Sequence, residues 1–398
     1  MSRIRVVHII NSFEYGGAEA MLCNLLLRSD TSRFEQSVVS LIDDMTVAGD
    51  VVRAGIPIVT MGMRPGLPDP RAIVRLALHL RRVRPDVVQT WMDHSNLIGG
   101  IAARAVRGCK VVWGVHHSNH VRGITKRSTL LTVSACARLS RRVPHRIVSC
   151  SRHAGEVYER LGFDRERMCV VPNGFDTSAF CPDETGRRRI RRECGLEEGA
   201  TVIGLVARYD PVKDHAGFLR AAAALLRTHP HVRFLLCGQG VDDGNADLRG
   251  LVASLGIERA CTLLGPRRDV ADVYRALDVA TSSSLSEAFP LAVGEAMACG
   301  VPCAVTDVGD SRLIVGDTGQ VAPPRDPDAL AAAWTQILAM PPEQRRQLGA
   351  AARERIVRLF DLTAVTRRYE QLYAELHAPV GRVGATREPM DGEVSVTA

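Results

Sequence analysis

Two basic residues stand where packing alone does not account for them. Arg208 and Lys213 are five positions apart and follow the apolar run TVIGLVA, which has the composition of a buried strand. Charges at the end of such a strand cost free energy unless they meet an anion. A guanidinium offers a planar fork to two phosphate oxygens, and an ammonium is a compact point charge. The spacing therefore indicates a phosphate site, and an ion pair to Asp210 or Asp214 is the alternative.

Two carboxylates occupy the later segment SSSLSEAFPLAVGEAMACGVP. Glu287 falls in the loop after the strand-like run DVATSSS, and Pro290 suits the first turn of a helix. Glu295 lies within that helix among Ala, Val and Met, so its carboxylate needs a partner. Two ribose hydroxyls would satisfy it, and an internal ion pair is the alternative. The amides around Leu291 and Ala292 would be free to bind a phosphate.

A glycine pair stands between the first predicted strand and the helix that follows it. Gly16 and Gly17 have no Cβ, so the backbone N–H groups of this loop can approach an anion at the start of the helix. An ordinary turn has the same composition, so the pair alone is weak evidence for a site.

The elements that must position these residues alternate regularly along the chain. Continuous apolar runs such as IRVVHII and DVVQTW are followed by amphipathic helix-like runs, and the rhythm restarts at TVIGLVARY. This pattern predicts parallel sheets covered by helices on both faces. We expect a Rossmann-like domain at 1–180, a linker at 181–199, a second Rossmann-like domain at 200–360, a helix at 361–377 that packs back on the first domain, and a disordered tail at 378–398.

Ligands of open parallel sheets bind beyond the carboxyl ends of the strands. Two facing domains of this type form a cleft lined by strand-to-helix loops, and the motifs described above fall in such loops. We therefore expect the chemistry in an interdomain cleft.

The composition of the 398 residues argues against several other classes of protein. The longest apolar runs are too short for a membrane-spanning helix of ~18 residues or more. The 11 cysteines are scattered and include no Cys-x-x-Cys pair, which favours free thiols in a reducing cytoplasm. We expect a cytoplasmic protein, and these cysteines give no support for a zinc site.

The net charge of +7 is concentrated in the first half of the chain. Residues 1–180 hold 25 Lys and Arg against 15 Asp and Glu, whereas the remainder holds 26 against 29. Few aromatic residues accompany the basic clusters, which argues against nucleic acid as a partner. The remaining interpretations are a solvated face and peripheral contact with an anionic membrane. Segment 122–142 suits an interfacial helix, and a buried helix with basic ends is the alternative.

Taken together, the motifs resemble the retaining glycosyltransferases of family 4. The resemblance covers about residues 3–375 and rests mainly on the Glu-x7-Glu block. In chain order it comprises Gly16-Gly-Ala-Glu19, Val171-Pro-Asn-Gly-Phe-Asp176, Arg208-x4-Lys213 and Glu287-x7-Glu295. It implies the GT-B fold, in which two Rossmann-like domains face each other across a cleft.

The resemblance also implies a role for each matching residue. Arg208 and Lys213 look like the pair that neutralises the nucleotide diphosphate. Glu295 looks like the ligand of the ribose, and Glu287 like the residue that contacts the donor sugar and takes part in catalysis.

Further positions complete the implied donor site. Gly16 and Gly17 resemble the loop that approaches the diphosphate from the N-terminal domain. The remaining donor-binding positions are Gly238, Gly240, Phe289, Pro290, Leu291 and Ala292.

A histidine of the N-terminal domain is expected beside the transferred sugar. His116 is the first candidate for this catalytic position, and His94 or His117 could fill it instead.

The chain departs from the family pattern in one segment, which often contains Gly-Gly-x-x-Glu in other members. It reads Thr306-Asp-Val-Gly-Asp-Ser-Arg312 here, which removes the basis for inferring the sugar or the acceptor.

The implied reaction moves a sugar from a nucleotide diphosphate to a hydroxyl with retention of configuration, without a metal or other cofactor. Attack on the face that the diphosphate leaves is favoured over a covalent intermediate on Glu287. The expected pathway is polysaccharide or glycolipid synthesis with a possibly lipid-linked glycan as acceptor, either in the cytoplasm or peripherally on the inner face of the cytoplasmic membrane. The alternatives are a nucleotide-sugar epimerase of the same fold and a non-catalytic glycan-binding or scaffold protein.

Overall fold

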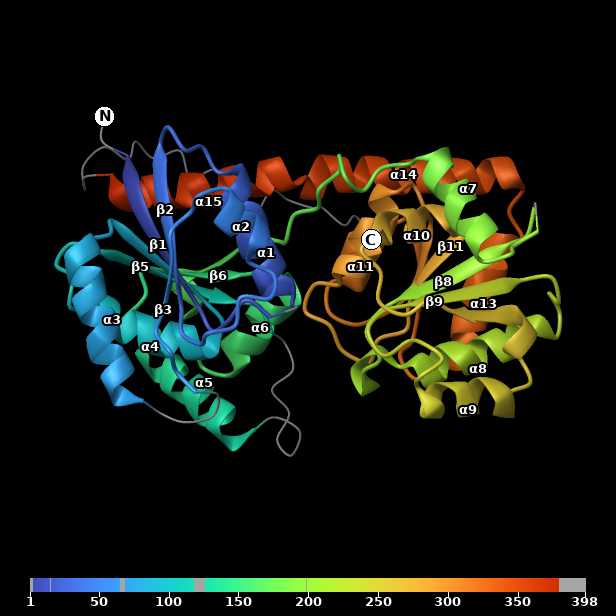
Figure 1. Cartoon of the computed structure of the whole chain (residues 1–398), viewed down its shortest axis with the longest axis horizontal. Coiled ribbons are helices and arrows are strands. Elements are labelled where there is room, and N and C mark those ends of the chain that lie inside the picture. The colour runs from blue at the N-terminus through green and yellow to red at the C-terminus, as the bar shows by residue number, and fades with distance from the viewer. Residues whose placement is uncertain (1–2, 15, 65–68, 118–125, 198, 379–398) are drawn as a thin grey trace. The chain divides into compact units, whose positions relative to one another are not determined.

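A computed structural model describes residues 3–14, 16–64, 69–117, 126–197 and 199–378. The chain divides into two compact units (Figure 1). Unit 1 comprises Met1–Gly174 and Leu362–Ala398, and unit 2 comprises Phe175–Asp361. Apart from residue 378, the expected disordered tail lies outside the described residues.

Unit 1 is built on a seven-stranded parallel sheet of order β3-β2-β1-β4-β5-β6-β7. Its strands are β1 (Ile4–Ile10), β2 (Phe34–Ser40), β3 (Ile58–Thr60), β4 (Val87–Trp91), β5 (Lys110–Val115), β6 (Arg146–Ser149) and β7 (Met168–Val170). All five residues of β4 are buried, because helices cover both faces of the sheet.

Two apolar clusters lie on the opposite faces of this sheet. One contains Trp91 and packs β1 and β4 against α1 and α15, and the other contains Trp113 and packs β4 and β5 against α3, α4 and α5. The helices are α1 (Gly17–Arg28), α2 (Gly49–Arg53), α3 (Pro70–Val83), α4 (Asp93–Ala103), α5 (Arg127–Leu139), α6 (Arg152–Arg160) and α15 (Leu362–His377).

Helix α15 follows unit 2 in the chain but belongs to unit 1, where it lies beside α1 and β1 (Figure 1). The side chain of Glu370 accepts hydrogen bonds from Ser29 Oγ at 2.8 Å and from the amide of Asp30 at 2.7 Å. The apolar face of α15 packs into the cluster around Trp91 through Leu362, Val365, Tyr369, Leu372 and Tyr373.

Unit 2 contains a second parallel sheet, of order β10-β9-β8-β11-β12-β13. Its strands are β8 (Val202–Val206), β9 (Arg233–Cys237), β10 (Cys261–Leu263), β11 (Val279–Ser282), β12 (Cys303–Thr306) and β13 (Gly319–Ala322). Its helices are α7 (Glu184–Glu193), α8 (His215–Leu226), α9 (Ala246–Ser254), α10 (Val270–Ala276), α11 (Leu291–Ala298), α12 (Ser311–Val315), α13 (Pro327–Leu338) and α14 (Pro342–Phe360). The prediction of two Rossmann-like domains with parallel sheets is confirmed.

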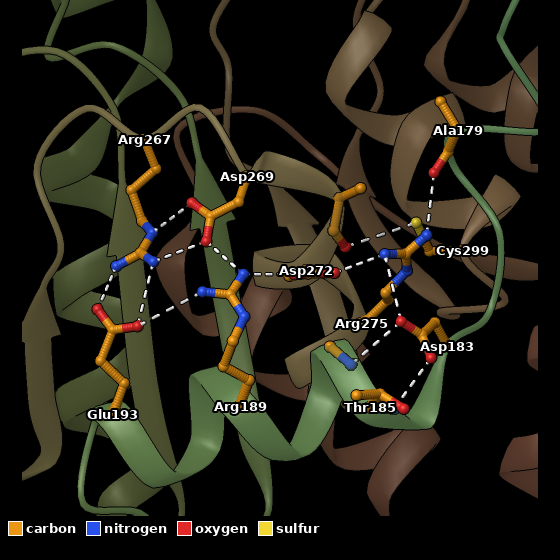
Figure 2. A network of polar contacts seen from close by, with 12 residues as sticks. Ala179, Asp183, Thr185, Arg189, Glu193, Arg267, Asp269, Asp272, Arg275 and Cys299 are labelled. Carbon is orange, nitrogen blue, oxygen red and sulfur yellow. Dashed lines mark hydrogen bonds and ion pairs between the residues drawn. The ribbon is translucent and has the colours of Figure 1, made fainter.

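The segment expected as a linker is instead part of unit 2. Residues 184–193 form α7, which ion pairs attach to the rest of this unit (Figure 2). Arg189 pairs with Asp269 at 2.5 Å and also with Asp272, while Arg267 bonds Glu193 at 2.5 Å and Asp269 at 2.8 Å. The Arg267 guanidinium holds the pKa of Asp269 well below its usual range. The charged residues that suggested a linker therefore attach α7 to the rest of unit 2.

Candidate functional site

The loop after β8 carries the two predicted diphosphate ligands. Asp210 accepts a hydrogen bond from the amide of Val212 at 2.9 Å, which begins the short 3₁₀ turn Pro211–Lys213. Arg208 donates to Asp210 Oδ2 from Nε at 3.2 Å and from Nη2 at 3.1 Å. This is the ion pair that the sequence left as an alternative. The Arg208 side chain is 59% exposed, so the pair contributes roughly 1 kcal/mol or less and a phosphate can compete for the guanidinium.

Lys213 reaches a different carboxylate, one that is 74 positions away in sequence. Its Nζ lies 2.5 Å from Glu287 Oε1, and that oxygen also accepts a hydrogen bond from Ser284 Oγ at 2.7 Å. The two strands that lead to these residues, β8 and β11, are direct neighbours in the sheet. Two residues that the sequence assigned to one site are thus in contact, and Ser284 joins them.

The loops around this ion pair are fastened by hydrogen bonds to the main chain. Ser283 Oγ donates to the carbonyl of Lys213 at 2.8 Å, and the amide of Leu285 donates to the carbonyl of Val212 at 2.7 Å. Thr306 Oγ1, at the end of β12, donates to the carbonyl of Ser284 at 2.6 Å. Three neighbouring strand ends therefore fix the position of the Lys213–Glu287 pair.

Helix α11 begins at the same edge of the sheet. Pro290 is its N-cap residue, and no side chain caps its first turn, so the amides around Leu291 and Ala292 have no side-chain partner from a cap. Glu295 lies one turn further along and accepts a hydrogen bond from Tyr274 Oη at 3.0 Å. Burial raises the pKa of the Glu295 carboxyl. Its partner is a hydroxyl rather than the cation of an internal ion pair.

The side chain of Phe289 does not lie at this edge. It is 6% exposed and packs against Phe175, at a centroid distance of 5.8 Å, and Phe360, at 5.7 Å. Any donor contact from this position must therefore come from the main chain. The ring instead anchors the start of α11 in an aromatic cluster of unit 2.

Two predicted glycines allow the loop after β9 to approach the loop after β8. A Cβ on Gly238, where φ is +153°, would lie 2.1 Å from the carbonyl oxygen of Ala207. Gly240 has φ +72°, and the carbonyl of Gln239 between them accepts a hydrogen bond from the amide of Tyr209 at 2.8 Å. These glycines support the Arg208 loop through the backbone.

In unit 1 the glycine pair stands at the start of α1, with Gly16 as the N-cap and Gly17 as the first helical residue. The Glu19 carboxylate folds back over this turn, and a Cβ on Gly16 would lie 2.2 Å from its Oε2. Burial raises the pKa of Glu19. The N-terminus of α1 is exposed at Gly16 and Gly17, but the Glu19 carboxylate already lies beside it.

The three candidate histidines of unit 1 have different surroundings. His117 is exposed, and His94 Nδ1 lies 3.3 Å from Thr132 Oγ1. His116 follows β5, and both of its ring nitrogens are buried with no hydrogen-bond partner among the described residues. Burial lowers the pKa of His116 to about 4. Among the described residues, His116 thus leaves the hydrogen-bonding capacity of both ring nitrogens unused.

The sequence did not reveal several groups that hold this site together. Tyr274 carries no motif that links it to Glu295, and nothing in the sequence links Trp91 to His116. Ser284 stands in the quoted Ser run at the end of a strand, which was a usable signal. Arg312, at the departure from the family pattern, pairs with Asp307 at 2.6 Å and is exposed.

The described residues show no cluster of three or more metal-ligating side chains. The Asp-x-Asp sequence at Asp326 and Asp328 lies at the start of α13, where Asp326 caps the helix by accepting from the amide of Ala329 at 2.9 Å. Within the same described ranges, none of the helices has the length and apolar character needed to cross a membrane.

Comparisons with known proteins identify the family of this chain. The model of the glycosyl transferases group 1 matches residues 186–355, and that of Glycosyltransferase Family 4 matches residues 15–179. The chain is 26% identical over 327 residues to the putative glycosyltransferase EpsF of Bacillus subtilis, covering 79% of this chain and 82% of EpsF. It is 34% identical over 202 residues to the D-inositol 3-phosphate glycosyltransferase of Corynebacterium urealyticum, covering 48% of each chain.

Solved structures share the fold at low sequence identity. Alr3699/HepE of Anabaena, solved in complex with UDP, matches with a TM-score of 0.81 and 20% identity over 94% of this chain and 100% of its own. Its complex with UDP-glucose matches with a TM-score of 0.80 and 19% identity, with the same coverage. These structures show the GT-B fold. The two family models together span residues 15–179 and 186–355, so the chain belongs to the family 4 glycosyltransferases. The comparisons favour neither an epimerase nor a scaffold protein.

Proposed function

We propose that this glycosyltransferase moves a sugar from a nucleotide-diphosphate donor to a hydroxyl acceptor with retention of configuration. The observation that carries the proposal is the Lys213–Glu287 contact of 2.5 Å beside the exposed Arg208. It brings a cation for the diphosphate next to a carboxylate for the sugar. HepE, a structural neighbour, was solved with UDP and with UDP-glucose, which supports a donor of this class.

The diphosphate gains negative charge as it leaves the sugar. Arg208, Lys213 and the amides at the start of α11 would stabilise that charge where it develops, which is the largest contribution in many enzymes. With this positive charge supplied by side chains and backbone, we propose that the reaction needs no metal. Glu295 would bind the ribose, because among the described residues its carboxylate has a hydroxyl partner, Tyr274, and no cation.

Glu287 is better suited to orienting the sugar than to forming a covalent bond with it. Its Oε1 is held by both Lys213 and Ser284, which lowers its nucleophilicity and fixes its direction. We therefore favour attack by the acceptor on the face that the diphosphate leaves, with the departing phosphate taking the acceptor's proton. We propose that His116 contacts the transferred sugar.

The proposed pathway is the synthesis of a polysaccharide or glycolipid, which the relation to EpsF supports. We place the enzyme in the cytoplasm with peripheral contact to anionic membrane. On α5, Leu131 is 71% exposed, and the basic residues Arg138 and Arg141 lie near the end of this helix. Residues 122–125 of the segment proposed for this contact lie outside the described ranges. Co-sedimentation with liposomes should increase with anionic lipid content, and binding that is insensitive to it would refute the contact.

The substitution Lys213→Ala tests the proposed function. We expect kcat/KM for transfer to fall by about 10²-fold or more, because a charge opposite the developing diphosphate is lost. Lys110→Ala is the matched control, since Lys110 begins β5 at the amino end of a strand in unit 1 and should leave transfer unchanged. Circular dichroism confirms that both variants fold. Normal transfer by folded Lys213→Ala would refute the assignment.

A further inference from the structure

Packing holds the imidazole of His116 in place. Both ring nitrogens are buried and have no partner among the residues that the structure describes. Gly114 leaves room for the ring, because a Cβ there would lie 3.0 Å from His116 Nε2 and 2.7 Å from the carbonyl oxygen of Thr90. The orientation of an imidazole without hydrogen bonds depends on the surfaces against which it packs.

The main surface is the indole of Trp91, the last residue of β4. The rings of His116 and Trp91 stack with centroids 4.9 Å apart and an interplanar angle of 22°. Tyr369 of α15 also stacks on Trp91, at 5.9 Å and 27°. Trp91 and Tyr369 are both fully buried. Aromatic pairs of this kind contribute roughly 0.5–1.5 kcal/mol beyond the area that they bury.

A hydrogen-bonded pair fixes the indole in turn. Trp91 Nε1 donates to His8 Nδ1 at 3.2 Å, and His8 Nε2 lies 2.7 Å from Gln36 Oε1. Since Nδ1 accepts from the indole, the proton of the neutral ring must be on Nε2, which then donates to Gln36. Burial lowers the pKa of His8 to about 4, so this neutral tautomer persists at physiological pH.

We propose that Trp91 is a positioning residue for His116, and that Tyr369 of the returning helix α15 completes the stack that orients this imidazole. The proposal rests on the role of His116 proposed above. Helix α15 thereby contributes to the geometry of a loop that follows β5. A misplacement of about 1 Å is enough to reduce a catalytic rate by up to ~10²-fold, so loss of the stack should slow transfer without touching the diphosphate ligands.

A double-mutant cycle with Trp91→Leu and His116→Ala tests the coupling. We expect each single variant to lower kcat by about tenfold or more, with little change in affinity for the nucleoside diphosphate. The double variant should be no slower than His116→Ala alone, because Trp91 acts through His116. Trp91→Phe keeps an aromatic face and should restore most of the rate. Multiplicative losses in the double variant, or full activity of His116→Ala, would overturn the proposal.

The orientation of the ring can also be measured without any turnover. In an NMR titration, His116 of the wild type should stay neutral down to about pH 5, and in Trp91→Leu or Tyr369→Leu its pKa should rise toward the ordinary value of about 6.5. Trp113→Leu is the matched control, because it truncates an equally buried indole in the cluster on the other face of the sheet. It should lower the melting temperature but leave the His116 signal in place.

An unchanged pKa of His116 in both Trp91→Leu and Tyr369→Leu would overturn the proposal that Trp91 positions His116, whichever sugar the enzyme transfers. Absence of transfer by the wild type from every nucleotide sugar tested would instead refute the proposed function, and the titration would still decide the stack.

Discussion

Each cation of the unit 2 site is paired with a carboxylate. Arg208 pairs with Asp210, and Lys213 pairs with Glu287. Both pairs lie in loops at the end of strands, where a diphosphate would compete for the same charges. The Arg208 side chain is exposed, so its pair is weak and exchanges readily, whereas the side chains of Lys213 and Glu287 are only 24% and 14% exposed.

The carboxylate of Glu295, which we propose as the ligand of the ribose, costs stability where it lies. Burial raises the pKa of this carboxyl above its ordinary value of 4.5, and Tyr274 only partly offsets the shift. Between the ordinary and the raised pKa, the folded state binds more protons than the unfolded state. The free energy of unfolding must therefore fall as the pH rises through that window, and the penalty remains at neutral pH.

The substitution Glu295→Gln tests this balance. It should remove the fall in stability across that pH window and raise the melting temperature at neutral pH. It should also weaken binding of a nucleoside diphosphate by about tenfold, because a charged acceptor for the ribose hydroxyls is lost. Denaturant unfolding at a series of pH values, together with calorimetric titration, measures both effects. An unchanged pH profile with unchanged affinity would contradict this account of Glu295.

At the scale of elements, the site depends on how α11 packs against the rest of unit 2. Gly294 faces Phe175 so closely that a Cβ would lie 2.0 Å from its Cζ, and Phe175 stacks on Phe289 just before the helix begins. The aromatic cluster thus sets the position of the α11 N-terminus and of Glu295. No side chain other than hydrogen fits at position 294 without moving the helix or the ring.

The same substitution at two helical glycines should therefore have opposite effects. Gly294→Ala should lower the free energy of unfolding by about 1–3 kcal/mol through overpacking, and it should weaken nucleotide binding. Gly250→Ala, in α9 with no atom within 4 Å of the added Cβ, should raise the free energy of unfolding by up to about 1 kcal/mol and leave binding unchanged. Equal effects of the two variants on stability would show that the packing at Phe175 is unimportant.

Much of this arrangement follows from local sequence, and some of it does not. Strands such as β4 and β8 are predictable, because their apolar runs are short, continuous and followed by amphipathic helices. Helix α7 was missed, because Ile190 is its only strongly apolar residue and its Arg side chains find their partners elsewhere in unit 2. The candidate ligands were predictable from charge at strand ends. Contacts such as Lys213–Glu287 were not, because the sheet order brings together residues far apart in sequence.

At the scale of the whole chain, the two units differ in how they use the C-terminus. Unit 2 is a continuous segment, whereas unit 1 needs α15 to complete its core. Loss of this helix would remove the buried side chains of Tyr369 and Tyr373 and expose the apolar residues around Trp91 against which they pack. The chain must therefore be synthesised through residue 377 before unit 1 can complete its apolar cluster, whereas unit 2 ends at Asp361.

The central claim, that Arg208 and Lys213 bind a diphosphate, is tested most directly by comparing two ligands. Calorimetric titration should use the nucleoside diphosphate that raises the melting temperature most in a panel of UDP, GDP and ADP, together with its monophosphate. We expect the wild type to bind the diphosphate at least about tenfold more tightly, since charge-assisted hydrogen bonds to the second phosphate are strong. In the double variant Arg208→Ala/Lys213→Ala, the two affinities should become nearly equal. A variant that folds and keeps the wild-type preference for the diphosphate would contradict the account.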